Sequence, residues 1–223
     1  MGTITAASVI DKAQTVLQDA TGVRWPDAEL LGWLNDGQRD VVLFKPNAYV
    51  RNESVLLAQG TKQSLPSGGV QLVNVVRNMG TTGNTPGRAV RIVKQEMLDA
   101  RVPNWHATTN DAEVQHFVYS PLDPKTFYVY PPNTGTGYVE IAFGAEPPDT
   151  SLGGNISLDN IMQTALIDYM LYRAFSKDTE FADSARSTAH YNAFLAAVSG
   201  KSSSEMGANP NVQAPANPRI TTQ

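Results

Sequence analysis

Residues 25–47 read WPDAELLGWLNDGQRDVVLFKPN, and this stretch predicts a long helix with one apolar face. Pro26, Asp27 and Glu29 suit a first helical turn, where proline loses no hydrogen bond and the helix dipole favours negative charge. The face expected to be buried repeats every three or four residues: Leu30, Trp33, Leu34, Gly37 and Val41. Because a glycine on that face admits a close neighbour, we expect a second helix to pack there, and the helix to end at residues 45–47.

Toward the N-terminus, residues 5–20 predict a shorter helix. One stripe at helical spacing is apolar: Ile10, Ala13, Val16 and Leu17. The helix is expected to begin at Thr5 or at Ser8, since Ser8 with an acidic residue three positions later resembles a capping box. Gly22 is expected to end it.

Two further helices are expected toward the C-terminus. Residues 157–175 are apolar on more than one side, which is typical of a mostly buried helix: Leu158, Ile161, Ala165, Ile167, Tyr169, Met170 and Phe175. Asp178 is expected to cap a following helix that ends at Gly200. The apolar face of that helix is expected to consist of Phe181, Ala185, Thr188, Tyr191, Leu195 and Val198.

Between the helical regions, the sequence changes to short β-rich runs. The runs expected to form strands are residues 54–58, 70–76, 89–93, 115–119, 126–130 and 138–143. Turns are predicted at residues 84–87 and 133–137, and residues 94–99 predict a short helix. Strands this closely spaced, with no long helix between them, predict an antiparallel sandwich or small barrel.

These elements predict an α+β protein. Residues 1–49 and 150–200 are expected to form a helical bundle from both ends of the chain. Residues 50–149 are expected to be inserted into it as an antiparallel β-rich domain. Residues 201–223 are expected to form an extended C-terminal tail, because three prolines forbid regular structure there.

Composition excludes several classes of function. The 223 residues include 17 basic and 21 acidic side chains, so the formal net charge is -4, which argues against binding duplex DNA through bulk electrostatics. The chain has no cysteine, which excludes disulfides, a thiol nucleophile and thiolate metal sites. No apolar run approaches the roughly 18 residues of a membrane span, and we expect a soluble protein with no membrane partner.

No motif indicates catalysis, a cofactor or a metal. His106, His116 and His190 lack the spacing of metal ligands. Gly200-Lys201-Ser202 resembles the end of a phosphate-binding loop, but Leu195 stands where that loop needs its first glycine. No serine lies in a nucleophile elbow. We therefore expect no catalytic, metal-binding or cofactor-binding residue. A pair of glycosidase carboxylates that are distant in sequence stays open as an alternative.

One basic cluster contrasts with the acidic background. It consists of Arg77, Arg88, Arg91 and Lys94. These residues flank a loop, residues 78–87, whose one large side chain is Met79. We interpret the cluster either as a surface that faces DNA or a partner, or as a solvated hairpin, which the acidic net charge favours.

Three parts of the chain resemble head-to-tail adaptor proteins of tailed bacteriophages. They are residues 25–39 (WPDAELLGWLNDGQR), residues 127–132 with 138–141 (FYVYPP and YVEI), and residues 168–178 with 190–194 (DYMLYRAFSKD and HYNAF). Their order and spacing extend the similarity from about Val9 to Lys201. The resemblance implies a structural protein of the virion at the head–tail junction, without enzymatic activity.

The resemblance also implies partners. Such adaptors form a ring, commonly of twelve copies, that lies beneath the portal protein, continues the DNA channel and receives the tail or nozzle protein. In related adaptors the C-terminal tail docks onto the portal, so the candidate portal-binding residues are Pro210, Val212, Pro215, Pro218, Arg219 and Ile220. Two other functions stay open, a virion-associated glycan hydrolase and a β-rich module that binds a ligand.

Overall fold

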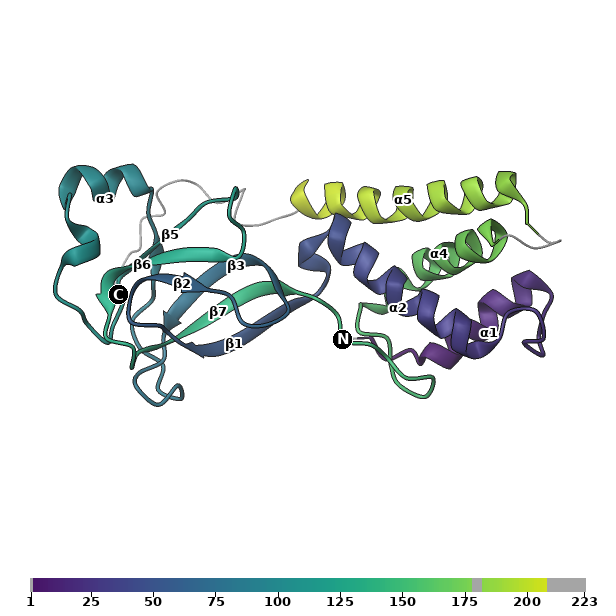
Figure 1. Cartoon of the computed structure of the whole chain (residues 1–223), viewed down its shortest axis with the longest axis horizontal. Coiled ribbons are helices and arrows are strands. Elements are labelled where there is room, and N and C mark those ends of the chain that lie inside the picture. The colour runs from purple at the N-terminus through teal and green to yellow at the C-terminus, as the bar shows by residue number, and fades with distance from the viewer. Residues whose placement is uncertain (1, 178–181, 208–223) are drawn as a thin grey trace, which may run out of the picture. The chain divides into compact units, whose positions relative to one another are not determined.

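The structure is a computed structural model that describes residues 2–177 and 182–207. The chain divides into two compact units (Figure 1). A helical unit combines the residues up to Lys45 with those from Pro148 onward, and a β-rich unit spans Pro46–Pro147. The expected α+β fold class is confirmed.

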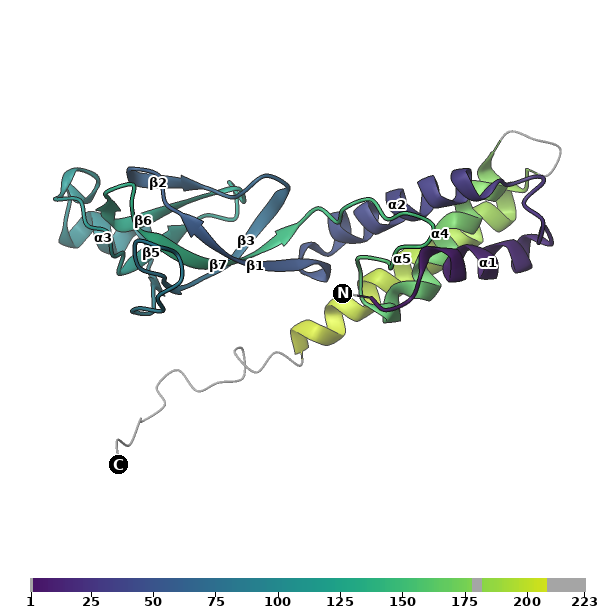
Figure 2. The ribbon, with the colours of Figure 1, turned by 90° about the horizontal axis from the view of Figure 1, so that it is seen from below.

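The described residues of the helical unit form α1 (Ala6–Leu17), α2 (Asp27–Phe44), α4 (Gln163–Ser176) and α5 (Ser184–Gly207). Helices α2 and α4 each contact the other three, and α4 packs most extensively against α5 (Figure 2). The predicted face of α2 is buried, from Leu30 to Val41. Gly37 on this face lies against Tyr169 and Leu166 of α4, so the expected close approach of a second helix is confirmed.

Helix α1 begins at one of its two expected caps but ends early. The hydroxyl of Thr5 accepts a hydrogen bond from the N–H of Ser8 (3.3 Å), as an N-cap does. The helix ends at Leu17, because Gln18 adopts a left-handed conformation with φ of 56° and its N–H bonds to carbonyls of the last turn. Gly22, the expected end, therefore lies beyond the helix.

Two side chains that were expected to be buried in this unit are exposed. Val16 is 54% exposed, because it lies beside the buried stripe of α1 and not within it. Ile161 is 65% exposed and precedes α4, which begins at Gln163 and not at Ser157. The later start has a local cause, since the carboxylate of Asp159 accepts the N–H of Ile161 (3.2 Å) and begins a separate 3-10 turn.

In the described residues, helix α5 is capped by Asp183. Asp178 and Phe181 lie outside the described residues. The carboxylate of Asp183 accepts hydrogen bonds from the N–H groups of Ala185 and Arg186, both at 3.0 Å. Asp183 therefore satisfies donors of the first turn, which is the role that we had assigned to Asp178.

The buried face of α5 is rotated from the expected one. Val198 is buried as expected, but Ser187 and Phe194 are buried in addition, whereas Ala185 and Thr188 are exposed. The hydroxyl of Ser187 donates to the carbonyl of Tyr172 on α4 (3.3 Å), so a polar residue occupies part of the packed face. The apolar pattern missed this face because it contains a serine.

The helix also continues past Gly200 and ends at Gly207. A glycine in a helix interior is about 1 kcal/mol less favourable than alanine but stops a helix only where it turns left-handed, and Gly200 has no positive φ. The expected extended tail therefore cannot begin at residue 201. The six candidate portal-binding residues, from Pro210 to Ile220, lie outside the described residues.

The β-rich unit contains two sheets in its described residues. The first has the order β1-β7-β3, with β1 (Val50–Leu56), β7 (Tyr138–Ala145) and β3 (Gly69–Asn78). The second has the order β2-β6-β5-β4, with β2 (Gly60–Ser64), β6 (Thr126–Asn133), β5 (His116–Tyr119) and β4 (Arg91–Ile92). Helix α3 (Gln95–Arg101) follows β4, close to the expected short helix.

Six strands lie where they were expected, with shifted ends, but two features of the sheets differ. Strand β2 was missed because its sequence, GTKQS, has no apolar residue, and its inward positions are the polar Thr61 and Gln63. Strands β4 and β5 run parallel, against the antiparallel expectation. The chain between them passes through α3, and a parallel pair needs such a crossover.

Candidate partner-binding surfaces

The structure places the residues of the basic cluster on neighbouring segments of the β-rich unit. Arg77 lies on β3 and pairs with Ala89, so the segment that carries Arg88 and Arg91 runs beside β3. Lys94 directly precedes α3. Arg88, Arg91 and Lys94 are all exposed.

Arg77 differs from the other members of the cluster because its charge is compensated. Its Nε lies 2.6 Å from Oε2 of Glu140, the residue opposite it in the register of β3 and β7. The exposed positive charge of the cluster therefore comes from Arg88, Arg91 and Lys94. A partner with acidic groups would meet these side chains first.

Hydrogen bonds anchor the loop of residues 78–87, which is flanked by the basic residues. The buried amide of Asn78 donates to the carbonyls of Arg88 (3.0 Å) and Val114 (2.8 Å), and its oxygen accepts the N–H of Val114 (2.9 Å). The N–H of Met79 donates to the carbonyl of Tyr138 (2.7 Å). The loop is thus tied to the sheet at its base, which fixes the backbone of Arg88.

A second candidate surface is an open groove of about 620 Å³ beside edge strand β4. Its lining includes Ile92, Lys94, Glu96 and Tyr119. Ile92 is 64% exposed, and burial raises the pKa of the Tyr119 hydroxyl. Small-molecule sites are enclosed, so this open groove suits a protein partner better.

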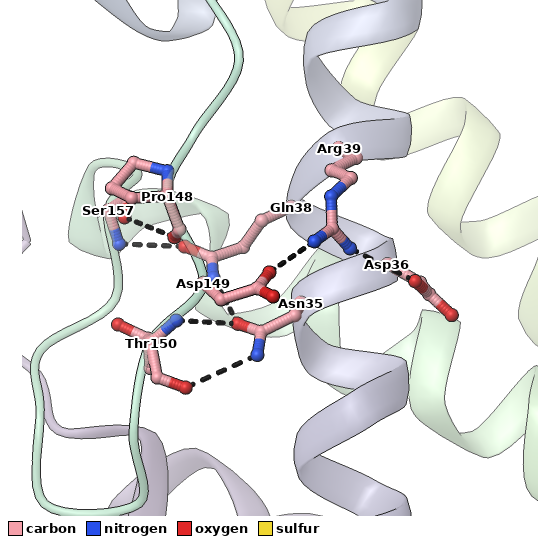
Figure 3. Close-up of polar contacts among 8 residues, drawn as sticks. All are labelled: Asn35, Asp36, Gln38, Arg39, Pro148, Asp149, Thr150 and Ser157. Atoms are coloured by element: carbon pink, nitrogen blue, oxygen red, sulfur yellow. Dashed lines mark hydrogen bonds and ion pairs between the residues drawn. The ribbon is translucent and has the colours of Figure 1, made fainter.

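The polar side of α2 faces inward, toward the segment through which the chain re-enters the helical unit (Figure 3). Asn35 donates to the carbonyl of Thr150 (3.2 Å) and accepts the N–H of the same residue (3.0 Å). Gln38 is 1% exposed and accepts the N–H of Ser157 (2.7 Å). These amides replace the hydrogen bonds that an irregular segment cannot make with itself.

Arg39 also links α2 to the segment that re-enters the helical unit. Its guanidinium forms ion pairs with Asp36 (3.1 Å) and with Asp149 of the re-entering segment (Figure 3). Residues 35–39 belong to the stretch that carried the resemblance, and in the structure they make contacts within the helical unit. Their spacing of three and four residues was the signal for this second, polar face, which the apolar pattern did not reveal.

Comparison with known families decides what kind of protein this is. The family model described as SU10 adaptor protein matches residues 4–219. The chain belongs to the SU10 adaptor protein family. The match spans both compact units, and it confirms the resemblance to phage head-to-tail adaptors. No curated protein matches the chain.

Two of the three histidines make side-chain hydrogen bonds, and the third, His116 on β5, stacks on the ring of Tyr130. His106 Nδ1 lies 2.8 Å from the hydroxyl of Thr61, and His190 Nδ1 lies 2.9 Å from the carboxylate of Asp168. Within residues 2–177 and 182–207, no three histidine, aspartate or glutamate side chains are grouped as a metal ion would require. In the same ranges, no helix is both long and apolar enough to cross a bilayer.

Proposed function

We propose that this adaptor is the structural connector between head and tail of a tailed phage virion and works by binding alone. Copies of the chain form a ring, twelve in the commonest case, beneath the portal protein. The ring continues the DNA channel and receives the tail or nozzle protein. The family match over residues 4–219 carries the proposal, because it covers both units and not one widely shared element.

The C-terminal tail is the part of the chain that we assign to the portal. Its candidate contact residues are Pro210, Val212, Pro215, Pro218, Arg219 and Ile220. Prolines restrict the unfolded chain to extended conformations, so less conformational entropy is lost when such a segment binds along a surface. The proline content of this segment therefore supports its assignment as the part of each subunit that attaches to the portal.

The charge of the chain supports passage of DNA without tight binding. A formal net charge of -4 gives little drive for the counterion release that makes proteins adhere to duplex DNA. Arg88, Arg91 and Lys94 are the candidate exception, since they are exposed while Arg77 is paired with Glu140. We assign these three residues to a contact with DNA or with an acidic surface of the portal.

The test is the mass of the purified protein, alone and mixed with its portal, by native mass spectrometry. A small species that becomes a ring of about twelve copies on the portal is expected. A protein that leaves the mass of the portal unchanged contradicts the proposal. Glycan hydrolysis and carbohydrate binding are then the activities to assay. The variant Arg88→Glu/Arg91→Glu/Lys94→Glu separates ring formation from the basic contact. Arg77→Gln is its control, because it removes a paired charge without placing an acid opposite Glu140.

A further inference from the structure

Strand β1 lies at the edge of its sheet and, in the described residues, pairs with β7 alone. Leu57 N–H donates to the carbonyl of Gly137, and Ala145 N–H donates to the carbonyl of Tyr49, both at 2.9 Å. Odd-numbered residues of this stretch therefore bond to β7. Because bonded positions alternate along an antiparallel strand, the backbone groups that point away from β7 belong to Val50, Asn52, Ser54 and Leu56.

The side chains of β1 place opposite charges next to each other. Arg51 and Glu53 form an ion pair and lie on the face shared with the buried residues of β7. The guanidinium of Arg51 lies 5.9 Å from the ring centroid of Phe143, its partner in the register. On the opposite face, Val50 is 40% and Leu56 48% exposed. The strand thus combines an open backbone edge with one positive and one negative side chain.

We propose that β1 pairs antiparallel with β1 of a second copy of this chain, joining two three-stranded sheets into one of six strands. Asn52 then lies opposite Asn52 of the partner subunit, and Val50 lies opposite Ser54 of the partner subunit. Arg51 lies opposite Glu53 of the partner subunit, twice by symmetry. The outward backbone groups of the even-numbered residues meet each other in this register, as an antiparallel ladder requires.

The charges of Arg51 and Glu53 favour this register over the two registers that are shifted by two residues. A shift of two residues in one direction places Glu53 opposite Glu53 of the partner subunit, and a shift in the other direction places Arg51 opposite Arg51 of the partner subunit. Like charges directly opposite each other destabilise a strand pair, and opposite charges stabilise it. A second copy of β1 is therefore complementary to β1 in one register and repelled in the two adjacent ones.

This contact is distinct from the proposed ring. A two-fold contact closes with two copies, whereas a ring needs a head-to-tail contact that propagates. The pairing also covers a backbone edge that otherwise templates non-specific aggregation. It is tested on the protein alone, without the portal, so its failure and the failure of the proposed ring are distinguishable.

Cysteine cross-linking tests the register directly, because the chain has no cysteine of its own. Asn52→Cys is expected to form an intermolecular disulfide on mild oxidation, since directly opposite, hydrogen-bonded Cα atoms lie about 5.5 Å apart. The matched control is Val50→Cys on the same face, which faces Ser54 of the partner subunit and is expected to stay reduced. Equal cross-linking of both variants, or of neither, overturns the proposal.

Charge reversal gives an independent test by sedimentation equilibrium. Glu53→Arg is expected to weaken dimerisation about tenfold or more, because four arginines then meet at the contact. The swap Arg51→Glu/Glu53→Arg is expected to restore it, with circular dichroism showing that each variant is folded. A native chain that stays monomeric at the highest concentration reached overturns the proposal, and the charges on β1 then protect an edge from pairing.

Discussion

The ring of Tyr169 packs directly against Gly37: a Cβ atom added to Gly37 would lie only 2.9 Å from Cδ1 of Tyr169. The ring fits there because glycine has no side chain. Tyr169 is 4% exposed, and its ring packs edge-on against Phe194 with centroids 5.2 Å apart. One tyrosine of α4 therefore joins α2 on one side to α5 on the other. Through this contact, a helix from the N-terminal part of the chain packs against helices from its C-terminal part.

Gly37→Ala is expected to destabilise the protein by about 1–2 kcal/mol, because the new methyl group overpacks against the buried ring. The matched control lies on the same helix. Gly32 is exposed with no atom within 4 Å of an added Cβ, so Gly32→Ala is expected to stabilise by roughly 0.5–1 kcal/mol through helix propensity. Urea denaturation measures both. The same sign for the two substitutions would contradict the packing argument.

Trp33→Ala is expected to lower the free energy of unfolding by about 3–5 kcal/mol, as truncation of a large buried aromatic side chain does. Trp33 is 9% exposed. Val16→Ala is the control, since Val16 is 54% exposed and its truncation is expected to change stability by about 0.5 kcal/mol or less. A loss below about 1 kcal/mol for Trp33→Ala would place that ring outside the core.

The apolar face of α2 could be predicted because burial alone sets its pattern. Leu30, Leu34 and Val41 recur at helical spacing and are fully buried, and Gly37 on the same face marks the helix contact. Strands with alternating apolar residues, such as β7, were found for the same reason. Hydrophobic periodicity reports which side of an element is covered.

Positions that depend on polar contacts could not be predicted in the same way. The carboxylate of Asp183 caps α5, and strand β2 turns Gln63 inward to bond Ala58 at 2.7 and 2.9 Å. Gln38 meets Ser157, a residue 119 positions later in the chain. Such partners are set by tertiary packing, and a local sequence pattern carries no information about them. The same holds for which exposed surface meets a partner.

Gln38→Met is expected to destabilise the protein by about 1–3 kcal/mol, because it leaves the buried N–H of Ser157 without its acceptor. Arg39→Ala one position later removes exposed ion pairs and is expected to matter less, about 1 kcal/mol at most. Thermal unfolding of the two variants gives the comparison. A larger loss for Arg39→Ala would mean that charge, not amide bonding, fixes the re-entering segment.

The loop between α1 and α2 is expected to make stability depend on pH through Asp19. Its carboxylate accepts the N–H groups of Val23, Arg24 and Trp25 at 2.8–3.1 Å. The bond from Trp25 contributes most to lowering the pKa of Asp19 below its ordinary value of 3.8, against an opposing effect of burial. The folded state therefore favours the ionised form. This contribution is present above the ordinary pKa and is lost as pH falls through the folded pKa.

Asp19→Asn is accordingly expected to lower the melting temperature at pH 7, and the gap to the native chain is expected to narrow below pH 3.8. Differential scanning calorimetry across this range makes the measurement. Asp11→Asn, an exposed carboxylate on α1, serves as the control and is expected to leave the melting temperature nearly unchanged. A gap for Asp19→Asn that stays constant with pH would rule out the ionised carboxylate as its cause.

Truncation after Gly207 is expected to leave the protein folded but to weaken its attachment to the portal about tenfold or more, since the candidate contacts from Pro210 to Ile220 are lost. The cut follows Gly207 and not Lys201 because α5 continues to that point. Phe194 and Val198 keep α5 packed, so circular dichroism should be unchanged. A control variant in which residues 208–223 are replaced by an equally long Gly/Ser segment keeps the length of the tail but removes its side chains. If it binds the portal as tightly as the native chain, the six side chains contribute nothing, and the portal must be bound through the two folded units.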